Sequence, residues 1–204
     1  MPSATYYVNE IFYSLQGEGH RTGRASLFVR FAGCNMRCDL EAGPLSPGGF
    51  ACDTEFESSR SYSEDELVAE IAAKAPVGAQ VVFTGGEPLR QLTGSLLGRI
   101  LRDCAVETNG SLPLPAGSEN LWVTCSPKVA EHAIKLDRCD ELKYVRGEGQ
   151  GIPHPALTAR YYYLSPAFDG MQPDRAAIAT CIKLVKENPQ WQLTMQVHKL
   201  LLIR

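Results

Sequence analysis

Three cysteines in one glycine-rich stretch are the residues best suited to do chemistry. Cys34 and Cys38 lie close together, and Cys52 follows after thirteen further residues. Three thiolates can hold three irons of a four-iron cluster and leave the fourth iron open to a cofactor or substrate. Zinc is the alternative, but a structural zinc site normally has four ligands, and the nearest histidine is His20. Taken alone, the triad favours an iron–sulfur cluster by a modest margin.

The other four cysteines are scattered along the chain, at Cys104, Cys125, Cys139 and Cys181. Free cysteine commonly behaves as a small buried hydrophobe, and we interpret these four in that way. The odd total of seven and the uneven spacing argue against a disulfide framework. They fit a reducing compartment, where clustered cysteines more often bind metal.

A second motif, Thr84-Gly85-Gly86-Glu87-Pro88, follows an apolar run. Paired glycines let a ligand approach the backbone closely, and Glu87 is available to accept hydrogen bonds from an ammonium group. An ordinary strand-to-helix turn also uses Gly-Gly and Pro. Next to the cysteine triad, the motif indicates a cofactor site.

Short apolar runs rich in β-branched and aromatic residues predict buried strands. These runs are Ser26–Phe31, Gln80–Thr84, Ala105–Thr108, Leu121–Thr124, Glu141–Val145, Tyr161–Leu164 and Gln192–Val197. Ser63 and Glu66 form a capping box that predicts a helix, and further helices are expected over Leu92–Arg102 and, after Asp174, over Arg175–Glu187. Alternation of strands and helices predicts an α/β fold with a parallel sheet or partial barrel. The second half lacks clear helices, so we expect the barrel to be incomplete there.

Polar and glycine-rich residues follow four of the predicted strands. Cys34, Gly85–Pro88, Asn109–Gly110 and Ser126–Lys128 each come directly after a strand. Ligands of parallel sheets bind outside the carboxyl ends of the strands. The four segments therefore predict one shared site.

Composition excludes several function classes. The net charge of −3 leaves no basic footprint for nucleic acid, and no apolar run approaches the ~20 residues of a membrane span. Met1–Glu10 lacks the pattern of a secretory signal. No linker divides the chain, so we expect one cytoplasmic domain over residues 1–204.

Together the triad and the Gly-Gly-Glu-Pro motif resemble the radical S-adenosylmethionine superfamily. Longer stretches are similar to the 7-carboxy-7-deazaguanine synthase family, and they are distributed along nearly the whole chain. They are Glu10–Gly19, Phe28–Asn35, Cys52–Thr54, Glu107–Gly110, Ser126–Lys128, Glu141–Lys143 and Trp191–Lys199.

The resemblance implies a modified, incomplete (β/α) barrel of the radical S-adenosylmethionine type, and usually a homodimer. It implies conversion of 6-carboxy-5,6,7,8-tetrahydropterin to 7-carboxy-7-deazaguanine and ammonia, on the route to queuosine and other deazapurines. The implied cofactors are a 4Fe–4S cluster, S-adenosylmethionine and Mg²⁺, and a flavodoxin is the expected reductant. A 5′-deoxyadenosyl radical would take hydrogen from C6 of the pterin, the ring would contract, hydrogen would return and ammonia would leave, with S-adenosylmethionine regenerated.

The resemblance also implies roles for individual residues. Cys34, Cys38 and Cys52 would hold the cluster, and the Thr54 hydroxyl would bind Mg²⁺, which prefers oxygen ligands. The residues implied at S-adenosylmethionine are Ala51, Cys52, Asp53, Gly86, Glu87, Ser126, Pro127, Lys128, Ser165, Pro166, Ala167 and Phe168. The residues implied at the pterin are Leu15, Gln16, Gly17, Glu18, Arg30, Thr84, His198 and Arg204. Among these, Arg30 suits the substrate carboxylate, because guanidinium and carboxylate pair bidentately.

Two features leave alternatives open. The family pattern has two residues between the second and third cysteines, whereas this chain carries an inserted cluster loop around residues 40–51; loop insertions cost little free energy. The apolar segment Leu200–Ile203 predicts a buried chain end that brings Arg204 to the substrate.

Two rival functions stay open. They are another small radical enzyme, such as a glycyl-radical activase, and a zinc-stabilised module without catalysis.

Overall fold

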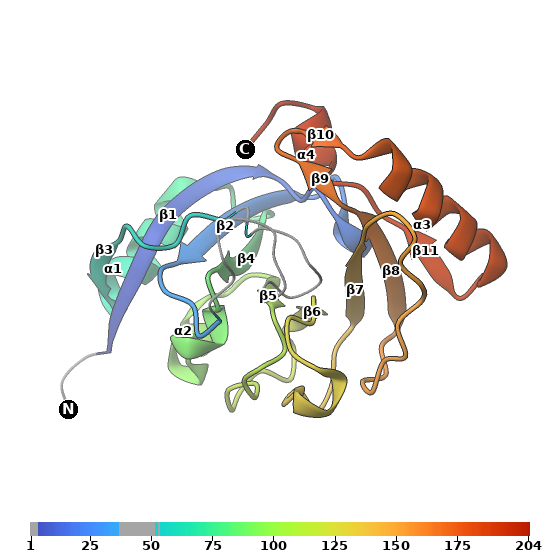
Figure 1. Cartoon of the computed structure of the whole chain (residues 1–204). Helices are drawn as coiled ribbons and strands as arrows, with labels where there is room; N and C mark the ends of the chain where they lie inside the picture. The colour runs from blue at the N-terminus through green and yellow to red at the C-terminus, as the bar shows by residue number, and fades with distance from the viewer. Residues whose placement is uncertain (1–3, 37–51, 53) are drawn as a thin grey trace.

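The computed structural model describes residues 4–36, 52 and 54–204. Within these residues, nine strands form one sheet in the order β11-β8-β7-β6-β5-β4-β2-β1-β3 (Figure 1). The strands are β1 (Thr5–Leu15), β2 (Ala25–Phe31), β3 (Arg60–Ser63), β4 (Gln80–Gly85), β5 (Cys104–Thr108), β6 (Trp122–Cys125), β7 (Glu141–Arg146), β8 (Tyr161–Pro166) and β11 (Trp191–Leu193). A small hairpin of β9 (Phe168–Asp169) and β10 (Gln172–Pro173) follows β8.

The run from β2 to β11 is parallel, whereas β1 pairs antiparallel with both β2 and β3. The sheet curves into an open arch (Figure 1), so the expected α/β fold with an incomplete barrel is confirmed. β1 was not predicted from its sequence. Its register shifts between Val8 and Glu10, and this bulge interrupts the alternation of buried and exposed residues.

The last predicted strand extends too far along the chain. β11 ends at Leu193, and the chain then forms the short helix α4 (Val197–Leu200). Thr194 N still donates to Leu164 O of β8, but Val197 N donates to Gly17 O instead. The end of the predicted strand therefore leaves the sheet to contact the turn after β1.

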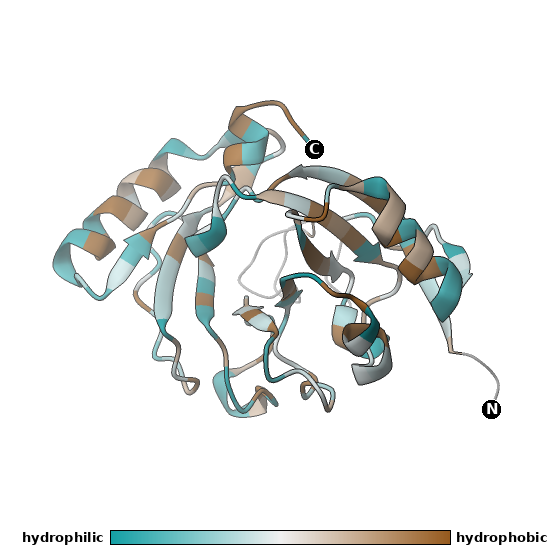
Figure 2. Cartoon of the chain, turned by 180° about the vertical axis from the view of Figure 1, so that it is seen from behind, coloured by the Kyte–Doolittle hydropathy of each residue, from teal (hydrophilic) through white to brown (hydrophobic). Residues whose placement is uncertain are grey.

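The helices cover the outer side of the arch. The capping box at Ser63 and Glu66 begins α1 (Glu64–Lys74), and Asp174 caps α3 (Arg175–Glu187), as predicted. α2 is shorter than predicted and spans Gly94–Arg99, because the Thr93 side chain caps its first turn. α1 packs against β1 and β3, and α3 packs against β7, β8 and β11. Figure 2 shows apolar and polar residues alternating along α3.

The described residues between β5 and β8 form no α-helix, only the short 3₁₀ helix η4 (Glu131–Ala133). The barrel is therefore incomplete in its second half, as expected. The main hydrophobic core lies on the side of the sheet that carries the helices, and it contains the four scattered cysteines as buried side chains.

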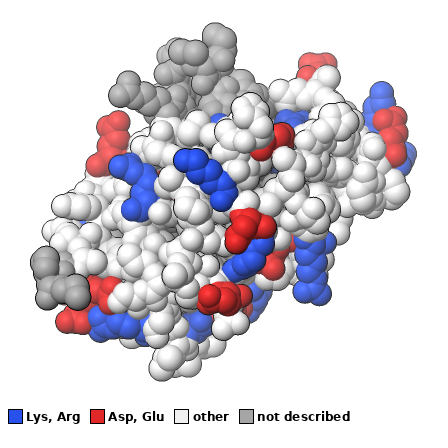
Figure 3. Space-filling view, turned by 90° about the horizontal axis from the view of Figure 1, so that it is seen from below, with Lys and Arg blue, Asp and Glu red and all other residues white. Residues whose placement is uncertain are grey.

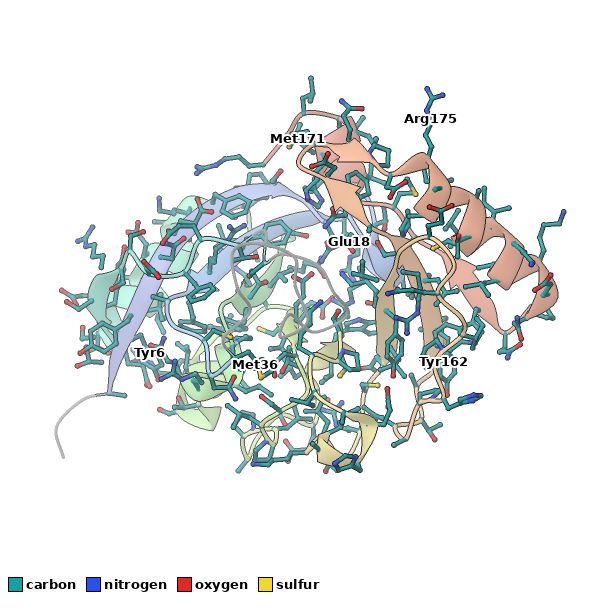
Figure 4. The ribbon with its side chains drawn as sticks, in the orientation of Figure 1. Tyr6, Glu18, Met36, Tyr162, Met171 and Arg175 are labelled. Atoms are coloured by element: carbon teal, nitrogen blue, oxygen red, sulfur yellow. The ribbon has the colours of Figure 1, made fainter. Side chains whose placement is uncertain are left out.

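A second, small cluster of Phe28, Val82 and Ala105, with Phe12 and Trp122 packed against it, lies apart from this core. Figure 4 shows Glu18 pointing into the concave side of the arch, whereas Met171 and Arg175 lie outside it. The concave side holds the site, whose lining includes both polar and aromatic side chains.

Basic and acidic side chains are interspersed on the face shown in Figure 3, and neither kind forms a continuous area there. Among the described helices, none has the length and apolar character needed to cross a membrane.

Candidate active site

Two adjoining cavities open at the carboxyl ends of the parallel strands. The larger has a volume of about 280 Å³ and the smaller of about 200 Å³. Their linings share Glu18, Thr54, Glu107, Gln196 and Lys199. Two ligands bound in these cavities would therefore touch common side chains.

Two of the predicted cluster ligands, Cys34 and Cys52, line the larger cavity. The Cys34 sulfur accepts hydrogen bonds from Met36 N at 3.4 Å and from Asn109 Nδ2 at 4.0 Å. Burial, with nearby Glu87 and Cys52, raises the pKa of the Cys34 thiol. A metal cation reverses this effect, because it deprotonates a thiol that coordinates it.

The donor set fits a thiolate-bound cluster. Two sulfurs line one cavity, and N–H groups point at one of them. Cys38, the predicted third ligand, lies outside the described residues. In the part of the chain that the structure describes, no group of three His, Cys, Asp or Glu side chains is arranged to hold a metal ion.

The paired glycines bring two strand ends together. Gly85 has φ +117°, and a Cβ there would lie 2.2 Å from Phe31 O. A Cβ on Gly86 would lie 2.2 Å from Gly33 O. Glycine is thus required at both positions, because β4 packs directly against the backbone that leads into Cys34.

The smaller cavity contains all the residues predicted for the pterin. Its lining includes Leu15, Gln16, Gly17, Glu18, Arg30, Thr84, His198 and Arg204. Phe12 and Phe28 also line it and stack with ring centroids 5.0 Å apart. The cavity therefore combines a flat aromatic wall with polar groups.

Arg30 is the cation best placed to bind an anion in the smaller cavity. Its Nη1 lies 3.4 Å from Glu10 Oε1, but its Nε is buried and has no hydrogen-bond partner among the described residues. A buried unpaired donor is costly. A carboxylate bound at Arg30 would pair this nitrogen.

Carboxylates occupy the wall between the cavities. Glu107 accepts hydrogen bonds from Gln16 Nε2 and Thr84 Oγ1, both at 2.9 Å. Glu18 pairs with Lys143 at 2.5 Å. Burial acts to raise the pKa of Glu18, but Lys143, Gln196 and His198 together outweigh it and the net pKa is lowered. Glu18 is therefore held ionised at the boundary.

Comparison with known proteins supports one family. No protein-family model matches the chain. The 7-carboxy-7-deazaguanine synthase of Bacteroides thetaiotaomicron is 38% identical over 97% of this chain and 98% of its own length. The enzyme of the same name from Burkholderia multivorans is 39% identical, with 97% and 98% covered.

The chain belongs to the 7-carboxy-7-deazaguanine synthase family. A solved structure, "Crystal structure of QueE from Escherichia coli", matches with a TM-score of 0.67 and 27% identity over 95% of each chain. Family membership makes the chain a lyase of the radical S-adenosylmethionine superfamily, in queuosine biosynthesis. It implies a 4Fe–4S cluster and S-adenosylmethionine as cofactors, and it sets aside the glycyl-radical activase and the zinc-stabilised module.

The residues predicted for S-adenosylmethionine divide into three groups. Those that line the larger cavity are Cys52, Gly86, Ser126, Lys128, Ser165, Pro166, Ala167 and Phe168. Ala51 and Asp53 lie outside the described residues. Glu87 and Pro127 are not among the lining residues of either cavity.

Glu87 is a buried hydrogen-bond acceptor in this structure, and its predicted contact with S-adenosylmethionine stays a prediction. Its side chain is fully buried and accepts hydrogen bonds from Thr108 Oγ1 at 2.7 Å, Asn109 N at 2.8 Å and Leu89 N at 3.0 Å. Burial raises the pKa of Glu87 although these hydrogen bonds oppose the shift. Its carboxylate joins the ends of β4 and β5.

Replacing Glu87 by alanine is therefore expected to destabilise the fold. Three donors would lose their acceptor, each at about 1–3 kcal/mol. At the lower limit of about 3 kcal/mol for the three donors together, we expect the Tm to fall by at least roughly 6–12 °C, using about 2–4 °C per kcal/mol for a chain of this size. Calorimetry measures this change, with exposed Glu119→Ala as the control. An unchanged Tm in Glu87→Ala would contradict the role as a buried acceptor.

The prediction of a buried chain end is wrong. Leu200, Leu201 and Leu202 are 49%, 57% and 79% exposed. Polar contacts hold the chain end instead. Ser14 Oγ donates to the Arg204 main-chain oxygen at 2.5 Å, and Arg204 Nη2 lies 2.6 Å from Glu10 Oε2. Arg204 thus reaches the smaller cavity without apolar packing of the preceding leucines.

Residues missed as site residues lie on the concave side of the sheet or near the chain end. They include Phe12, Phe28, Glu107, Lys143, Gln196 and Lys199. Several belong to stretches that carry the family resemblance, such as Glu107–Gly110. In the sequence, these residues could be recognised only by their position near a strand end. That position does not show which side chains face the concave side of the sheet.

Proposed function

We propose that this chain converts 6-carboxy-5,6,7,8-tetrahydropterin to 7-carboxy-7-deazaguanine and ammonia. The observation that carries the proposal is the unpaired, buried Arg30 Nε beside an aromatic wall, in a cavity that adjoins the cysteine-lined one. Guanidinium suits the substrate carboxylate, and the ring wall suits a flat heterocycle.

Cys34, Cys38 and Cys52 would hold the cluster at the larger cavity. A bound, reduced cluster would supply one electron for the reductive cleavage of S-adenosylmethionine. The protein's own part is to bind, orient and exclude water. The larger cavity offers Ser126, Lys128 and the Ser165–Phe168 segment to S-adenosylmethionine.

The smaller cavity would orient the pterin from both ends. Arg30 would take the carboxylate, and Gln16, Glu18 and Glu107 would face the nitrogen-bearing edge of the ring with acceptors for its N–H groups. The residues shared by both cavities bring the substrate next to S-adenosylmethionine. Such positioning makes hydrogen transfer effectively unimolecular.

Magnesium belongs to the same proposal. Thr54 lines both cavities, so its hydroxyl can meet an ion that also contacts the substrate. Carboxylate, carbonyl and hydroxyl oxygens are the ligands that Mg²⁺ prefers.

Thr54→Ala is expected to weaken the response of turnover to Mg²⁺ while iron content stays unchanged. Loss of outer-shell partners alone costs about 10- to 100-fold in metal affinity, so we expect the half-activating Mg²⁺ concentration to rise at least about tenfold. Turnover titrated with Mg²⁺ measures this, with exposed Thr158→Ala as the control. An unchanged titration curve would remove Thr54 from the magnesium site.

Partners and location complete the proposal. A flavodoxin-type reductant would deliver electrons, and the enzyme would work in the cytoplasm as a homodimer. Exposed apolar side chains at Tyr13 and Leu200–Leu202 support an interface between copies. Sedimentation equilibrium tests this, and a monomer at micromolar concentration would exclude it.

The substrate is tested by comparing two pterins under anaerobic conditions. We expect turnover with the 6-carboxy compound and a large loss with a tetrahydropterin that lacks the carboxylate. Equal turnover of both would contradict carboxylate recognition by Arg30.

A further inference from the structure

The segment Glu141-Leu142-Lys143 of β7 has no role in the function described so far. Residues two apart on a strand face the same side, and Leu142 is fully buried in the main core. Glu141 and Lys143 therefore face the concave side. Each of them has a partner in the turn after β1, more than 120 positions away in the chain.

Glu141 is a buried carboxylate whose two oxygens are both used. Its Oε1 accepts from Trp122 Nε1 at 2.9 Å and from Thr124 Oγ1 at 2.8 Å, and its Oε2 accepts from His20 N at 2.5 Å. The side chain is 3% exposed. Two bonds fix the carboxylate on β6, and the third fixes the backbone of the turn.

Gly19 packs directly against the same carboxylate. It has φ +71°, and a Cβ there would lie 2.2 Å from Glu141 Oε2. Gly19 N donates to Thr194 Oγ1 at 2.8 Å. The backbone of the turn is thus held by side chains from β7 and from the segment after β11.

Lys143 holds the side chain of the same turn. Its Nζ lies 2.5 Å from Glu18 Oε2, and both side chains are only 14% exposed. Gln196 Nε2 donates to the other oxygen of Glu18 at 3.2 Å. Glu18 lines both cavities, so its placement depends on Lys143 as well as on its own backbone.

We propose that Glu141 and Lys143 are positioning residues for substrate recognition, which hold the Gly17–His20 turn so that Glu18 stands between the two cavities. A ligand-binding turn that is fixed before binding loses less entropy when the ligand arrives. The inference rests on the proposed function, because the ligand that it concerns is the carboxytetrahydropterin.

The sharpest test uses two glycines of the same β1–β2 connection. Gly23 has φ +85° and Gly19 has φ +71°, so alanine strains the backbone at both. A Cβ at Gly23 meets nothing within 4 Å, whereas a Cβ at Gly19 meets Glu141. Gly19→Ala is expected to weaken equilibrium binding of the pterin to the cluster-loaded enzyme at least about tenfold, and Gly23→Ala to change it less than about threefold.

A double-mutant cycle tests Lys143. Lys143→Met and Glu18→Gln are each expected to raise the Kd for the pterin, with iron content unchanged. Because Lys143 acts through Glu18, the Kd of the double variant for the pterin should not exceed that of the single variant with the higher Kd. Exposed Lys183→Met on α3 is the matched control.

These experiments distinguish an error in the positioning role of Glu141 and Lys143 from an error in the proposed substrate. Equal pterin affinity in Gly19→Ala and Gly23→Ala, or multiplied losses in the double variant, would overturn the positioning role. If Lys143→Met does not fold, the glycine pair decides the question. Failure of the unaltered enzyme to bind the pterin would instead overturn the proposed substrate.

Discussion

Cys34→Ala is expected to remove the iron–sulfur cluster and all measurable turnover. Three thiolates are needed to hold three irons of the cluster, and Cys34 lines the larger cavity with N–H groups directed at its sulfur. Iron and sulfide analysis after anaerobic reconstitution measures the loss, together with visible absorbance. Cys38→Ala and Cys52→Ala should behave in the same way.

Cys181→Ala is the matched control for this experiment. Cys181 is a fully buried thiol of α3 that packs in the main core, and burial raises its pKa to about 11. Its replacement should lower stability through lost packing while iron content stays at the level of the unaltered enzyme. Full iron content in Cys34→Ala, or loss of iron in Cys181→Ala, would show that the ligands are assigned wrongly.

Arg30→Met is expected to produce the second large effect, on substrate affinity alone. Removing one partner of a buried, hydrogen-bonded charge pair costs about 2–5 kcal/mol. This corresponds to a rise in the Kd for the carboxytetrahydropterin of roughly 30-fold to several thousand-fold. Methionine retains an apolar stem and removes the guanidinium, whose carbon lies 5.6 Å from the centroid of the Phe12 ring.

Arg24→Met is the control for Arg30. Arg24 pairs with Asp103 and is absent from the linings of both cavities. We expect it to leave pterin affinity unchanged, and neither variant to alter S-adenosylmethionine binding. If the Kd of Arg30→Met for the pterin lies within about threefold of that of the unaltered enzyme, the substrate carboxylate binds elsewhere.

Local patterns predicted the parallel part of the sheet well. Apolar runs such as Gln80–Thr84 are buried on both faces and leave a continuous signal in the sequence. β1 escaped prediction because its alternation stops at the bulge: Tyr6 and Val8 are buried, whereas no later residue of the strand is. The chain end was predicted wrongly because an apolar run does not reveal whether a surface exists to cover it.

The candidate site was predicted mainly through family resemblance. Residues such as Leu15, Thr84 and His198 are far apart in the chain, and the structure gathers them in one cavity; their roles stay predictions. Glu87 shows the limit of a motif, because its position was predicted but the direction of its carboxylate was not. The Lys143–Glu18 contact joins residues 125 positions apart, and no local pattern indicates such a pair.

The central claim is that this family member contracts a carboxytetrahydropterin at two adjoining cavities. Its most direct test is anaerobic incubation of the reconstituted enzyme with the pterin, S-adenosylmethionine, Mg²⁺ and a reductant, followed by mass spectrometry and an ammonia assay. We predict 7-carboxy-7-deazaguanine and ammonia in equal amounts, over many turnovers and without net consumption of S-adenosylmethionine. Steady accumulation of 5′-deoxyadenosine with the pterin unchanged would contradict the claim.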